Sequence, residues 1–480
     1  MIDVKRNLTL LTDLYELTMM NGYLQKGKDK EVVIFDVFFR QNELITYSLA
    51  AGLEQAIDYV LSFKFTKSDI EYLRSINVFG EDFLSYLANL KFTGDIYSVP
   101  EGTMVFPGEP ILTVKAPVIE AQLIETAVLN IINHQTLIAS KAAKIRHSAG
   151  NDTVMEFGLR RAQGPDAGIY GSRASVIGGC NSTSNVLAGK LFDIPVAGTH
   201  AHSWVMSFPT EYEAFKAYAD IYPDKALFLV DTYDVLKSGI PNAIKVFDEL
   251  KAKGKKPMGI RLDSGDLAYL TKKARKMLDE AGYPDTVICA SGDLDEKLIQ
   301  SLKLQGAKIN SWGIGTKLIT SADMPALGGV YKLVGVVNED GSITPKIKIS
   351  ETSAKITNPG FKKVVRIYDG ETGKAEADLI MLFDETIDQT KPLTITHPTE
   401  TWKKMTFTNY KIKELSVKVV EAGKLVYKFP SVKEIASYAK SEMQSFWDEY
   451  LRLDRPHIYK VDLSDKLLKL KTDMLAEIRK

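Results

Sequence analysis

The first 150 residues switch repeatedly between helical and strand-like hydrophobic patterns. Apolar residues recur at helical spacing from residue 8 to residue 24, a stretch that includes Tyr15. Val32 to Arg40 is rich in β-branched and aromatic residues and predicts a strand. The segments that follow favour helix, helix, a turn-punctuated β-rich block and a long helix, in that order: 47–63, 66–76, 94–117 and 121–148. Residues 1–150 therefore predict an N-terminal α+β domain.

From about residue 154, short apolar runs alternate with amphipathic helical patterns. Each run ends in polar or glycine-containing residues, and the runs cover 154–160, 194–203, 226–232, 258–266, 287–293, 309–316 and 330–336. Strands that alternate with helices are typical of α/β proteins with a parallel sheet. The pattern predicts an irregular β/α barrel of about seven strands over residues 151–345. An open doubly wound sheet is the alternative, but no G-x-G-x-x-G sequence follows the first strand.

The chain departs from this alternation after about residue 345. Strand-like segments at 346–355 and 363–382 precede amphipathic helical patterns at 431–452 and 463–479. These features predict a C-terminal accessory region of mixed strands and terminal helices over residues 346–480.

Composition limits the classes of partner. The 480 residues carry 61 basic and 61 acidic side chains, so no net charge favours nucleic acid or an anionic membrane. No run approaches the roughly 18 apolar residues of a membrane span, and the N-terminus lacks the apolar core of a signal peptide. The two cysteines are too few for a disulfide framework or a four-cysteine zinc site. We expect a cytoplasmic protein that binds small molecules, with no nucleic-acid or membrane partner.

The segment from Gly198 to Ser203 concentrates candidate chemistry. Its histidines, His200 and His202, stand two residues apart, so both would share one face of an extended backbone. Two histidines bonded to backbone groups are one interpretation. A metal pair, a general base and a histidine that carries a phosphoryl group are the others. A metal-dependent barrel hydrolase built on this pair would need further ligands, and the remaining four histidines fall outside the repeated strand ends.

Other polar residues also follow predicted strands, where β/α barrels place their chemistry. Arg261 and Asp263 would both point into the barrel mouth, either as a salt bridge or with Arg261 as an anion ligand. The two Ser-Gly-Asp sequences at 264–266 and 291–293 fit helix caps, and also phosphate binding at helix starts. The glycine-rich turns at 313–316 and 326–329 fit the phosphate site that follows late barrel strands.

Taken together, these motifs resemble the nicotinate phosphoribosyltransferase family, of the barrel type shared with quinolinate and nicotinamide relatives. The resemblance covers roughly residues 8 to 360 and rests on five motifs in the family's order: Leu11–Tyr15, Glu156–Arg161, Gly198–Ser203, Arg261–Asp266, and Gly313–Thr316 with Gly328–Leu333. No departure occurs within them.

The resemblance implies that nicotinate and phosphoribosyl pyrophosphate become nicotinate mononucleotide and pyrophosphate. It also implies coupling to ATP hydrolysis through a phosphohistidine at His202, with His200 in a variable position and no role of its own. Magnesium, ATP as a co-substrate and a homodimer with sites that borrow residues across the interface belong to the same implication. The substrate-binding residues that it implies are Tyr15, Thr199, Arg261, Thr316, Arg160, Asp263 and Gly329.

Three other functions remain open at this point. A nicotinamide-specific transferase and the metal-dependent hydrolase are the enzymatic alternatives, and a non-catalytic nucleotide-binding relative is a third hypothesis. The choice between a carboxylate and an amide on the pyridine ring cannot be read from these residues.

Overall fold

The computed structural model describes residues 6–40, 46–351, 355–397, 400 and 402–478. The chain divides into two compact units. Unit 1 combines Met1–Ser140 with Ala326–Lys480, and unit 2 is Lys141–Pro325. This division differs from the three consecutive regions predicted, because the chain returns to unit 1 after completing unit 2.

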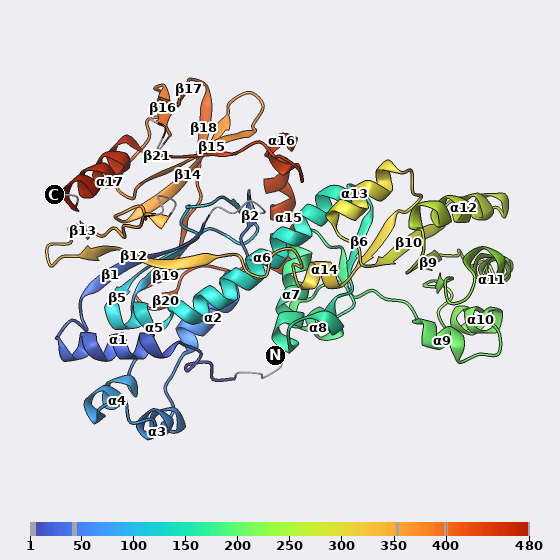
Figure 1. Ribbon diagram of the computed structural model, residues 1–480, viewed down its shortest axis with the longest axis horizontal. Coiled ribbons are helices and arrows are strands. Elements are labelled where there is room, and N and C mark those ends of the chain that lie inside the picture. Colours follow the sequence, from blue (N-terminus) through green and yellow to red (C-terminus); the bar gives the residue numbers. More distant parts are fainter. Residues whose placement is uncertain (1–5, 41–45, 352–354, 398–399, 401, 479–480) are drawn as a thin grey trace. The chain divides into compact units, whose positions relative to one another are not determined.

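A seven-stranded antiparallel sheet forms the centre of unit 1, in the order β13-β12-β1-β5-β3-β19-β20 (Figure 1). The bounds of its strands are β1 Val32–Phe39, β3 Asp95–Ser98, β5 Leu112–Pro117, β12 Gly329–Val337, β13 Ile343–Pro345, β19 Val417–Glu421 and β20 Lys424–Leu425. A separate two-stranded sheet joins β2 Ser48–Leu49 to β4 Met104–Val105. The helices of this part are α1 Leu14–Gln25, α2 Leu53–Ser62, α3 Lys67–Ser75, α4 Glu81–Leu87, α5 Val118–Leu123 and the first part of α6 Glu125–Ala149.

β12 corrects the predicted strand count of the barrel. Residues 330–336 were expected to form its seventh strand, but β12 pairs with β1, from Val32 opposite Val337 to Phe39 opposite Gly329. Tyr331 stacks on Phe35 with ring centroids 4.5 Å apart, and both side chains are buried. An aromatic pair across neighbouring strands stabilises that register. The hydrophobic run was correctly predicted as a strand, but its sheet was wrong because an apolar run does not specify its partner.

A second sheet of six strands lies in the C-terminal part of unit 1, in the order β17-β16-β21-β15-β14-β18. Its strands are β14 Lys362–Asp369, β15 Ala375–Leu382, β16 Leu393–Thr396, β17 Lys404–Phe407, β18 Tyr410–Glu414 and β21 Lys460–Leu463, and its helices are α15 Val432–Gln444, α16 Asp448–Leu451 and α17 Asp465–Ile478. Ser431 and Glu434 form a capping box at the start of α15.

Unit 2 is built on a six-stranded parallel sheet, in the order β7-β6-β11-β10-β9-β8. The strands are β6 Thr153–Glu156, β7 Ser182–Thr183, β8 Leu227–Leu229, β9 Gly259–Leu262, β10 Val287–Gly292 and β11 Ser311–Ile314. The helices are the 3₁₀-helix η1 Leu159–Arg161, α7 Pro165–Ile177, α8 Val186–Phe192, α9 His202–Met206, α10 Glu211–Ile221, the π-helix η2 Val235–Gly239, α11 Ile240–Ala252, α12 Leu267–Glu280, α13 Glu296–Leu304 and α14 Thr316–Ile319. The α/β class is confirmed. The seven-stranded barrel is not, because β7 and β8 end the sheet and do not pair among the described residues.

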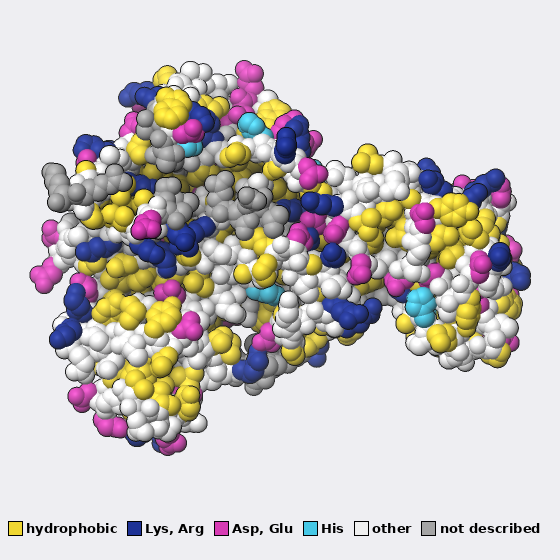
Figure 2. All heavy atoms as spheres, viewed as in Figure 1, with side chains coloured by type: hydrophobic (Ala, Val, Ile, Leu, Met, Phe, Trp, Pro, Cys, Tyr) yellow, Lys and Arg dark blue, Asp and Glu magenta, His cyan; other side chains and the backbone are white. Residues whose placement is uncertain are grey.

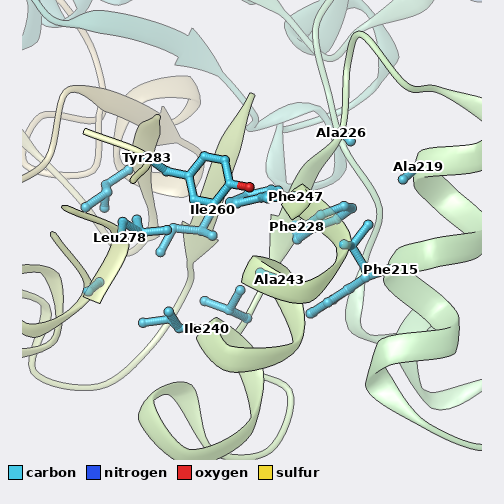
Figure 3. Close-up of a cluster of buried hydrophobic side chains, with 14 of the residues drawn as sticks. Phe215, Ala219, Ala226, Phe228, Ile240, Ala243, Phe247, Ile260, Leu278 and Tyr283 are labelled. Atoms are coloured by element: carbon cyan, nitrogen blue, oxygen red, sulfur yellow. The ribbon is translucent and has the colours of Figure 1, made fainter. Parts of the chain in front are cut away.

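An aromatic row packs the helices of unit 2 against β8 (Figure 3). Phe228 of β8 lies between Phe215 of α10 and Phe247 of α11, with centroid distances of 4.8 Å and 5.5 Å. Tyr283 continues the row at 5.4 Å from Phe247. All four side chains are buried, and burial of large aromatic side chains supplies much of a core's stability. The row fixes β8, an edge strand, in place.

The segment predicted as a strand over 194–203 is mostly irregular. Val196 forms a single bridge with Thr183, and His202 is the first residue of helix α9. The prediction that both histidines share one strand face is therefore wrong. Thr199 and the small residues Gly198 and Ala201 beside the histidines favour a turn over an extended strand.

Acidic and basic side chains are interspersed over the face of the molecule in Figure 2, in keeping with the balanced composition. None of the described helices is both long enough and apolar enough to cross a membrane.

Candidate active site

A cavity of about 450 Å³ lies at the carboxyl ends of β6, β9, β10 and β11. Five predicted site residues line it together: Arg160, Thr199, Arg261, Asp263 and Thr316. The other lining residues are Phe157, Arg161, Ser184, Gly198, His200, Ala201, Ser291, Gly292, Asp293, Gly313 and Gly315. The carboxyl ends of parallel strands meet at one edge of the sheet, so residues far apart in sequence converge there.

Arg261 reaches the cavity from β9 with unused hydrogen-bonding capacity. Its Nη1 donates to the Thr199 hydroxyl at 3.0 Å, while its Nε is buried and has no hydrogen-bond partner among the described residues. A buried N–H without a partner is costly, and at the wall of a cavity a ligand can supply the missing acceptor. The guanidinium group is therefore arranged to receive an anion or another acceptor.

Asp263 follows Arg261 by two residues, and the two side chains have different partners. The Ser291 hydroxyl donates to Asp263 Oδ1 at 2.5 Å. The Asp263 amide and the Ser264 hydroxyl both donate to Asp231 Oδ2, at 2.8 Å and 2.7 Å. Both side chains of the predicted i, i+2 pair do face the cavity, but no salt bridge between them is seen.

Glu156 shapes the loop that carries Arg160. Its side chain is fully buried and accepts hydrogen bonds from the Ser172 hydroxyl at 2.9 Å, the Thr183 hydroxyl at 2.6 Å and the Gly158 amide. A Cβ atom on Gly158 would lie 2.5 Å from Ile319, so only glycine lets this loop pack against α14. Glu156 is thus fully used inside the protein, and its role is to hold the loop.

His202 lies at the start of α9, next to the cavity-lining Ala201. Its Nδ1 is 3.1 Å from the hydroxyl of Thr232, and its ring is half-buried. One ring nitrogen thus has a protein partner, which leaves Nε2 as the nitrogen available for chemistry.

His200 lines the cavity but points into the protein. Its side chain is buried, and its Nε2 accepts a hydrogen bond from the Leu229 amide at 3.4 Å. Burial is the main cause that lowers the pKa of His200 to about 4, and the positive charge of Arg261 adds to it. The two imidazoles have separate partners, so they do not form a metal pair. Among the described residues, no group of three or more His, Cys, Asp or Glu side chains could hold a metal ion.

Tyr15 and Gly329 belong to unit 1, whereas the other predicted site residues belong to unit 2. Tyr15 lies on α1 and is 48% exposed. Partial burial and a hydrogen bond to Glu16 raise the pKa of Tyr15 above its usual range. Gly329 begins β12, where a Cβ atom would lie 2.0 Å from Asn133 Oδ1. A side chain at that position would displace Asn133.

Several lining residues were absent from the predicted site. Arg161 is adjacent to Arg160 in the same motif, and both line the cavity from η1. Ser184 follows the two-residue strand β7, which has no apolar run to reveal it. The polar sequence 181–185, placed between Gly179 and the apolar start of α8, was the available signal for a strand end there.

The charges at the cavity suit a ligand with several anionic groups. Three guanidinium groups, from Arg160, Arg161 and Arg261, accompany the carboxylates of Asp263 and Asp293. Guanidinium groups bind phosphate and carboxylate through paired N–H donors. Carboxylate oxygens are suitable ligands for Mg²⁺, which usually reaches such sites with substrate phosphates. This donor set fits a magnesium-bound phosphate ester.

Sequence comparison relates the whole chain to one family. A model of the nicotinate phosphoribosyltransferase (NAPRTase) family matches residues 153–372, and models of the family's N-terminal and C-terminal domains match residues 10–133 and 361–471. The nicotinate phosphoribosyltransferase of Bacillus subtilis is 49% identical over 474 residues, covering 98% of this chain and 96% of the relative. The human enzyme of that name is 33% identical over 525 residues, covering 97% and 96% of the two chains.

Solved structures agree with the sequence comparison. The crystal structure of human nicotinic acid phosphoribosyltransferase superposes with a TM-score of 0.85 at 31% identity, over 96% of this chain and 99% of that one. The nicotinate-nucleotide pyrophosphorylase of Pyrococcus furiosus shares the fold, with a TM-score of 0.69 at 21% identity over 92% and 97% of the two chains. The region after residue 360, which no sequence motif assigned, is matched by the family's C-terminal domain. The chain belongs to the nicotinate phosphoribosyltransferase family.

Proposed function

We propose that this chain is an enzyme that transfers a phosphoribosyl group from phosphoribosyl pyrophosphate to nicotinate, a step of NAD biosynthesis. Family membership over nearly the full chain supports the reaction. The observation in the structure that carries the proposal is Arg261, whose buried Nε has no protein partner at a cavity that also holds arginines and glycine turns. Such a site fits one carboxylate and several phosphate oxygens.

We assign nicotinate to Arg261 and Thr199. The guanidinium group can pair with the pyridine carboxylate, and the Thr199 hydroxyl that it already contacts would border the ring. Tyr15 is proposed as a further contact to the ring. Nicotinamide offers no negative charge to Arg261, so the proposal predicts that nicotinate is the much better substrate.

The phosphoribosyl donor is assigned to the remaining residues. Thr316 begins a helix immediately after a glycine, and exposed N–H groups at such a position bind phosphate. Arg160 and Gly329 are proposed to serve the donor as well. Asp263, with Asp293, would hold a magnesium ion that neutralises pyrophosphate as charge moves to the leaving group.

The residues fit the chemistry of the displacement. Loss of pyrophosphate from the anomeric carbon of the ribose builds positive charge on the sugar, and nicotinate nitrogen forms the new bond there. The protein's task is mainly to position the two substrates and to stabilise the separating charges. Arg160, Arg161 and Arg261, which line the cavity, are proposed to offset the charges of the pyrophosphate and the carboxylate.

We propose that ATP hydrolysis is coupled to this transfer through phosphorylation of His202. The contact between Nδ1 and Thr232 orients the ring and leaves Nε2 to attack the terminal phosphoryl group of ATP, with ADP as the leaving group. The phosphoryl group would add about −1.5 to −2 charges beside the cavity at neutral pH. Hydrolysis of the phosphohistidine then releases phosphate and restores the imidazole.

Radioactive labelling with γ-³²P-ATP tests the role of His202. The unmodified protein and a His457→Ala control, altered at an exposed histidine, should incorporate acid-labile label, and His202→Ala should incorporate none. His202→Ala should still form nicotinate mononucleotide, at a reduced rate and without ATP hydrolysis. A His202→Ala enzyme that hydrolyses ATP in step with product formation would refute the proposed phosphohistidine. Absence of nicotinate mononucleotide from the unmodified protein would refute the transferase itself.

We also propose a cytoplasmic homodimer. Each unit exposes large apolar side chains: Leu14 and Tyr15 on α1 are 54% and 48% exposed, and Val186 on α8 is 71% exposed. Clusters of exposed apolar side chains mark interaction surfaces. Cys180 and Cys289 are buried free thiols, which suits a reducing compartment. Light scattering of the purified chain measures the mass that this proposal predicts.

A further inference from the structure

The segment from Pro195 to His200 lies between the two edges of the sheet in unit 2. On one side it makes backbone hydrogen bonds to β7: the Thr183 amide donates to the Pro195 carbonyl at 3.0 Å, and the Ala197 amide donates to the Thr183 carbonyl at 2.9 Å. On the other side it contacts β8 through the His200 side chain. One short segment therefore touches both ends of the sheet.

The amide of Leu229 needs this contact. The next amide, that of Val230, donates to the Arg261 carbonyl of β9 at 3.0 Å. Successive amides of a strand point to opposite sides, so the Leu229 amide points away from β9, toward the edge of β8 that pairs with no strand in the described part of the chain. Leu229 is fully buried, and a buried amide without an acceptor is strongly unfavourable. The imidazole of His200 supplies the acceptor that a neighbouring strand would supply.

The hydrogen bonds of His200 define one neutral tautomer. Because the Leu229 amide donates, Nε2 must be the nitrogen without a proton. Nδ1 then carries the proton, and it faces the carbonyl oxygen of Ala201 at 3.5 Å. Tyr218 meets the ring edge-on at a centroid distance of 4.9 Å, and Phe215 lies 6.1 Å away. The surroundings thus hold the ring in one orientation and in its uncharged form.

We propose that His200 is a positioning residue for the transfer reaction: by accepting the Leu229 amide it fixes the segment 199–202, which sets Thr199 against Arg261 and His202 beside Thr232. Thr199 precedes His200, and its hydroxyl accepts from Arg261. His202 follows by two residues, and its Nδ1 lies beside Thr232. A shift of the segment 199–202 would move both the Thr199 contact with Arg261 and the His202 contact with Thr232. Small displacements of positioned groups reduce reaction rates strongly.

This inference rests on the proposed function and deepens it. It concerns two steps that can be measured separately. The contact between Thr199 and Arg261 concerns nicotinate binding and is independent of ATP. The placement of His202 concerns phosphorylation. His200 itself, without a free nitrogen, takes no part in the chemistry.

Three substitutions separate the acceptor from the shape of the ring. His200→Gln places an amide oxygen near the position of Nε2 and keeps the acceptor. His200→Phe keeps the ring and removes the acceptor. His200→Asn keeps an amide oxygen one bond too short to reach β8, and it replaces His200→Phe should the latter not give folded protein. Phe247→Leu is the matched control. It weakens the aromatic row that Phe228 and Phe247 form, which His200 also contacts through Phe228, but Phe247 is not part of the segment 199–202.

The decisive measurement is how each variant divides its effect between KM and kcat. His200→Phe and His200→Asn should raise the KM for nicotinate about tenfold or more, with the KM for the phosphoribosyl donor within about twofold, because Thr316 and Arg160 belong to other strand ends. His200→Gln should stay within about threefold of the unmodified enzyme. Phe247→Leu should lower the melting temperature and leave both KM values unchanged.

Two results would overturn the proposal. One is a His200→Phe or His200→Asn enzyme that behaves as Phe247→Leu does, with lower stability and unchanged KM for nicotinate. The other is a His200→Gln enzyme as impaired as His200→Phe, since the acceptor would then be irrelevant. An unmodified protein that makes no nicotinate mononucleotide would instead refute the proposed function.

A pH profile distinguishes positioning from general-base catalysis. The titratable and charged groups that face His200 are Arg261 of β9, His202 of α9 and Tyr218 of α10. The pKa of His200, lowered to about 4, keeps the ring neutral from pH 5.5 to 8. His200→Gln should therefore show the unmodified pH profile of kcat/KM across that range. Loss of a limb near pH 6 to 7 in this variant would identify His200 as a base and overturn the positioning role.

Discussion

Two arginines, one in each unit, illustrate opposite uses of the same side chain. Arg366, fully buried in unit 1, donates to both carboxylate oxygens of Asp378, to Glu442 and to the carbonyl of Met104, at distances of 2.7 to 2.8 Å. Arg261 in unit 2 makes one hydrogen bond to Thr199 and leaves its buried Nε without a partner. Arg366 is fully buried and Arg261 has a buried Nε at the cavity wall, but only Arg366 has all of its guanidinium nitrogens paired by the protein.

The difference separates a structural charge from a functional one. A buried charge whose hydrogen bonds are all satisfied has nothing left for a ligand and serves the fold. A buried donor without a partner represents stability that the protein forgoes until a ligand supplies the acceptor. Substitution of Arg366 should therefore affect stability alone, and substitution of Arg261 should affect activity alone.

Arg366→Met should give the largest effect. It leaves Asp378 buried without its cation and removes one of the two cations that pair with Glu442, which keeps Lys413. Loss of one partner from a buried ion pair costs about 3–5 kcal/mol. Thermal or chemical denaturation measures the loss, and kcat per folded molecule should be unchanged. Arg74→Met is the matched control, because the pair between Arg74 and Glu81 is exposed and should contribute far less to stability. Equal losses in the two variants would contradict the distinction.

Arg261→Gln should come next, with its effect on catalysis. Loss of a desolvated charged contact to nicotinate should lower kcat/KM by about 30-fold or more, equivalent to roughly 2 kcal/mol. The melting temperature should stay the same or rise slightly, since an uncompensated buried donor is removed. Steady-state kinetics with nicotinate and a denaturation curve measure the two effects. A stability loss comparable with that of Arg366→Met would place Arg261 among the structural charges.

Glu109→Gln should give the smallest effect, and one that depends on pH. Burial and the adjacent Asp378 carboxylate raise the pKa of Glu109 well above its usual value, so this group keeps its proton to a higher pH in the folded protein than in the unfolded chain. The stability that the proton provides is fully present below the unfolded pKa of about 4.5 and is lost as pH rises through the raised folded pKa. Glutamine mimics the protonated acid at every pH. The variant should match the unmodified protein near pH 4.5 and exceed its melting temperature increasingly toward pH 8.

Denaturation curves at several pH values measure this third effect. A constant difference between the two proteins across the range would show that Glu109 does not exchange a proton on unfolding. Arg366→Met and Glu109→Gln together would sharpen the comparison further, because both act on the carboxylate of Asp378 and their effects should not be additive.

The sequence predicted which residues line the site better than it predicted the contacts that hold them in place. Strand ends at Arg160, Arg261, Asp263 and Thr316 could be located because apolar runs before them mark where parallel strands stop. Ser184 was not found, since β7 is only two residues long and gives no hydrophobic signal. His200 was taken as a residue without a role. Its contact with Leu229 exists because β8 is an edge strand of the sheet. A local sequence pattern does not predict which strands lie at the edges.

The fold was predictable to the level of class and repeat. Alternating apolar runs and helical stripes identified the α/β unit, while the long-range pairing of β12 with β1 was missed. Both are strands with apolar side chains, as the strands of unit 2 are, and an apolar run does not specify its sheet. Pairing partners are selected by complementary surfaces such as Phe35 and Tyr331, which are recognisable only after the strands have been brought together.

The interrupted course of unit 1 has a consequence for synthesis on the ribosome. β1 lies between β5 and β12, and Val32 pairs with Val337. One edge of β1 therefore stays unpaired until β12 has been synthesised. At about 5–20 residues per second, many seconds of translation separate the two strands, and all of unit 2 emerges in between. The nascent chain must protect an open, apolar strand edge throughout that interval. Unit 2, which carries the cavity, can fold before the last strands of unit 1 have been synthesised. It is therefore expected to complete its folding first.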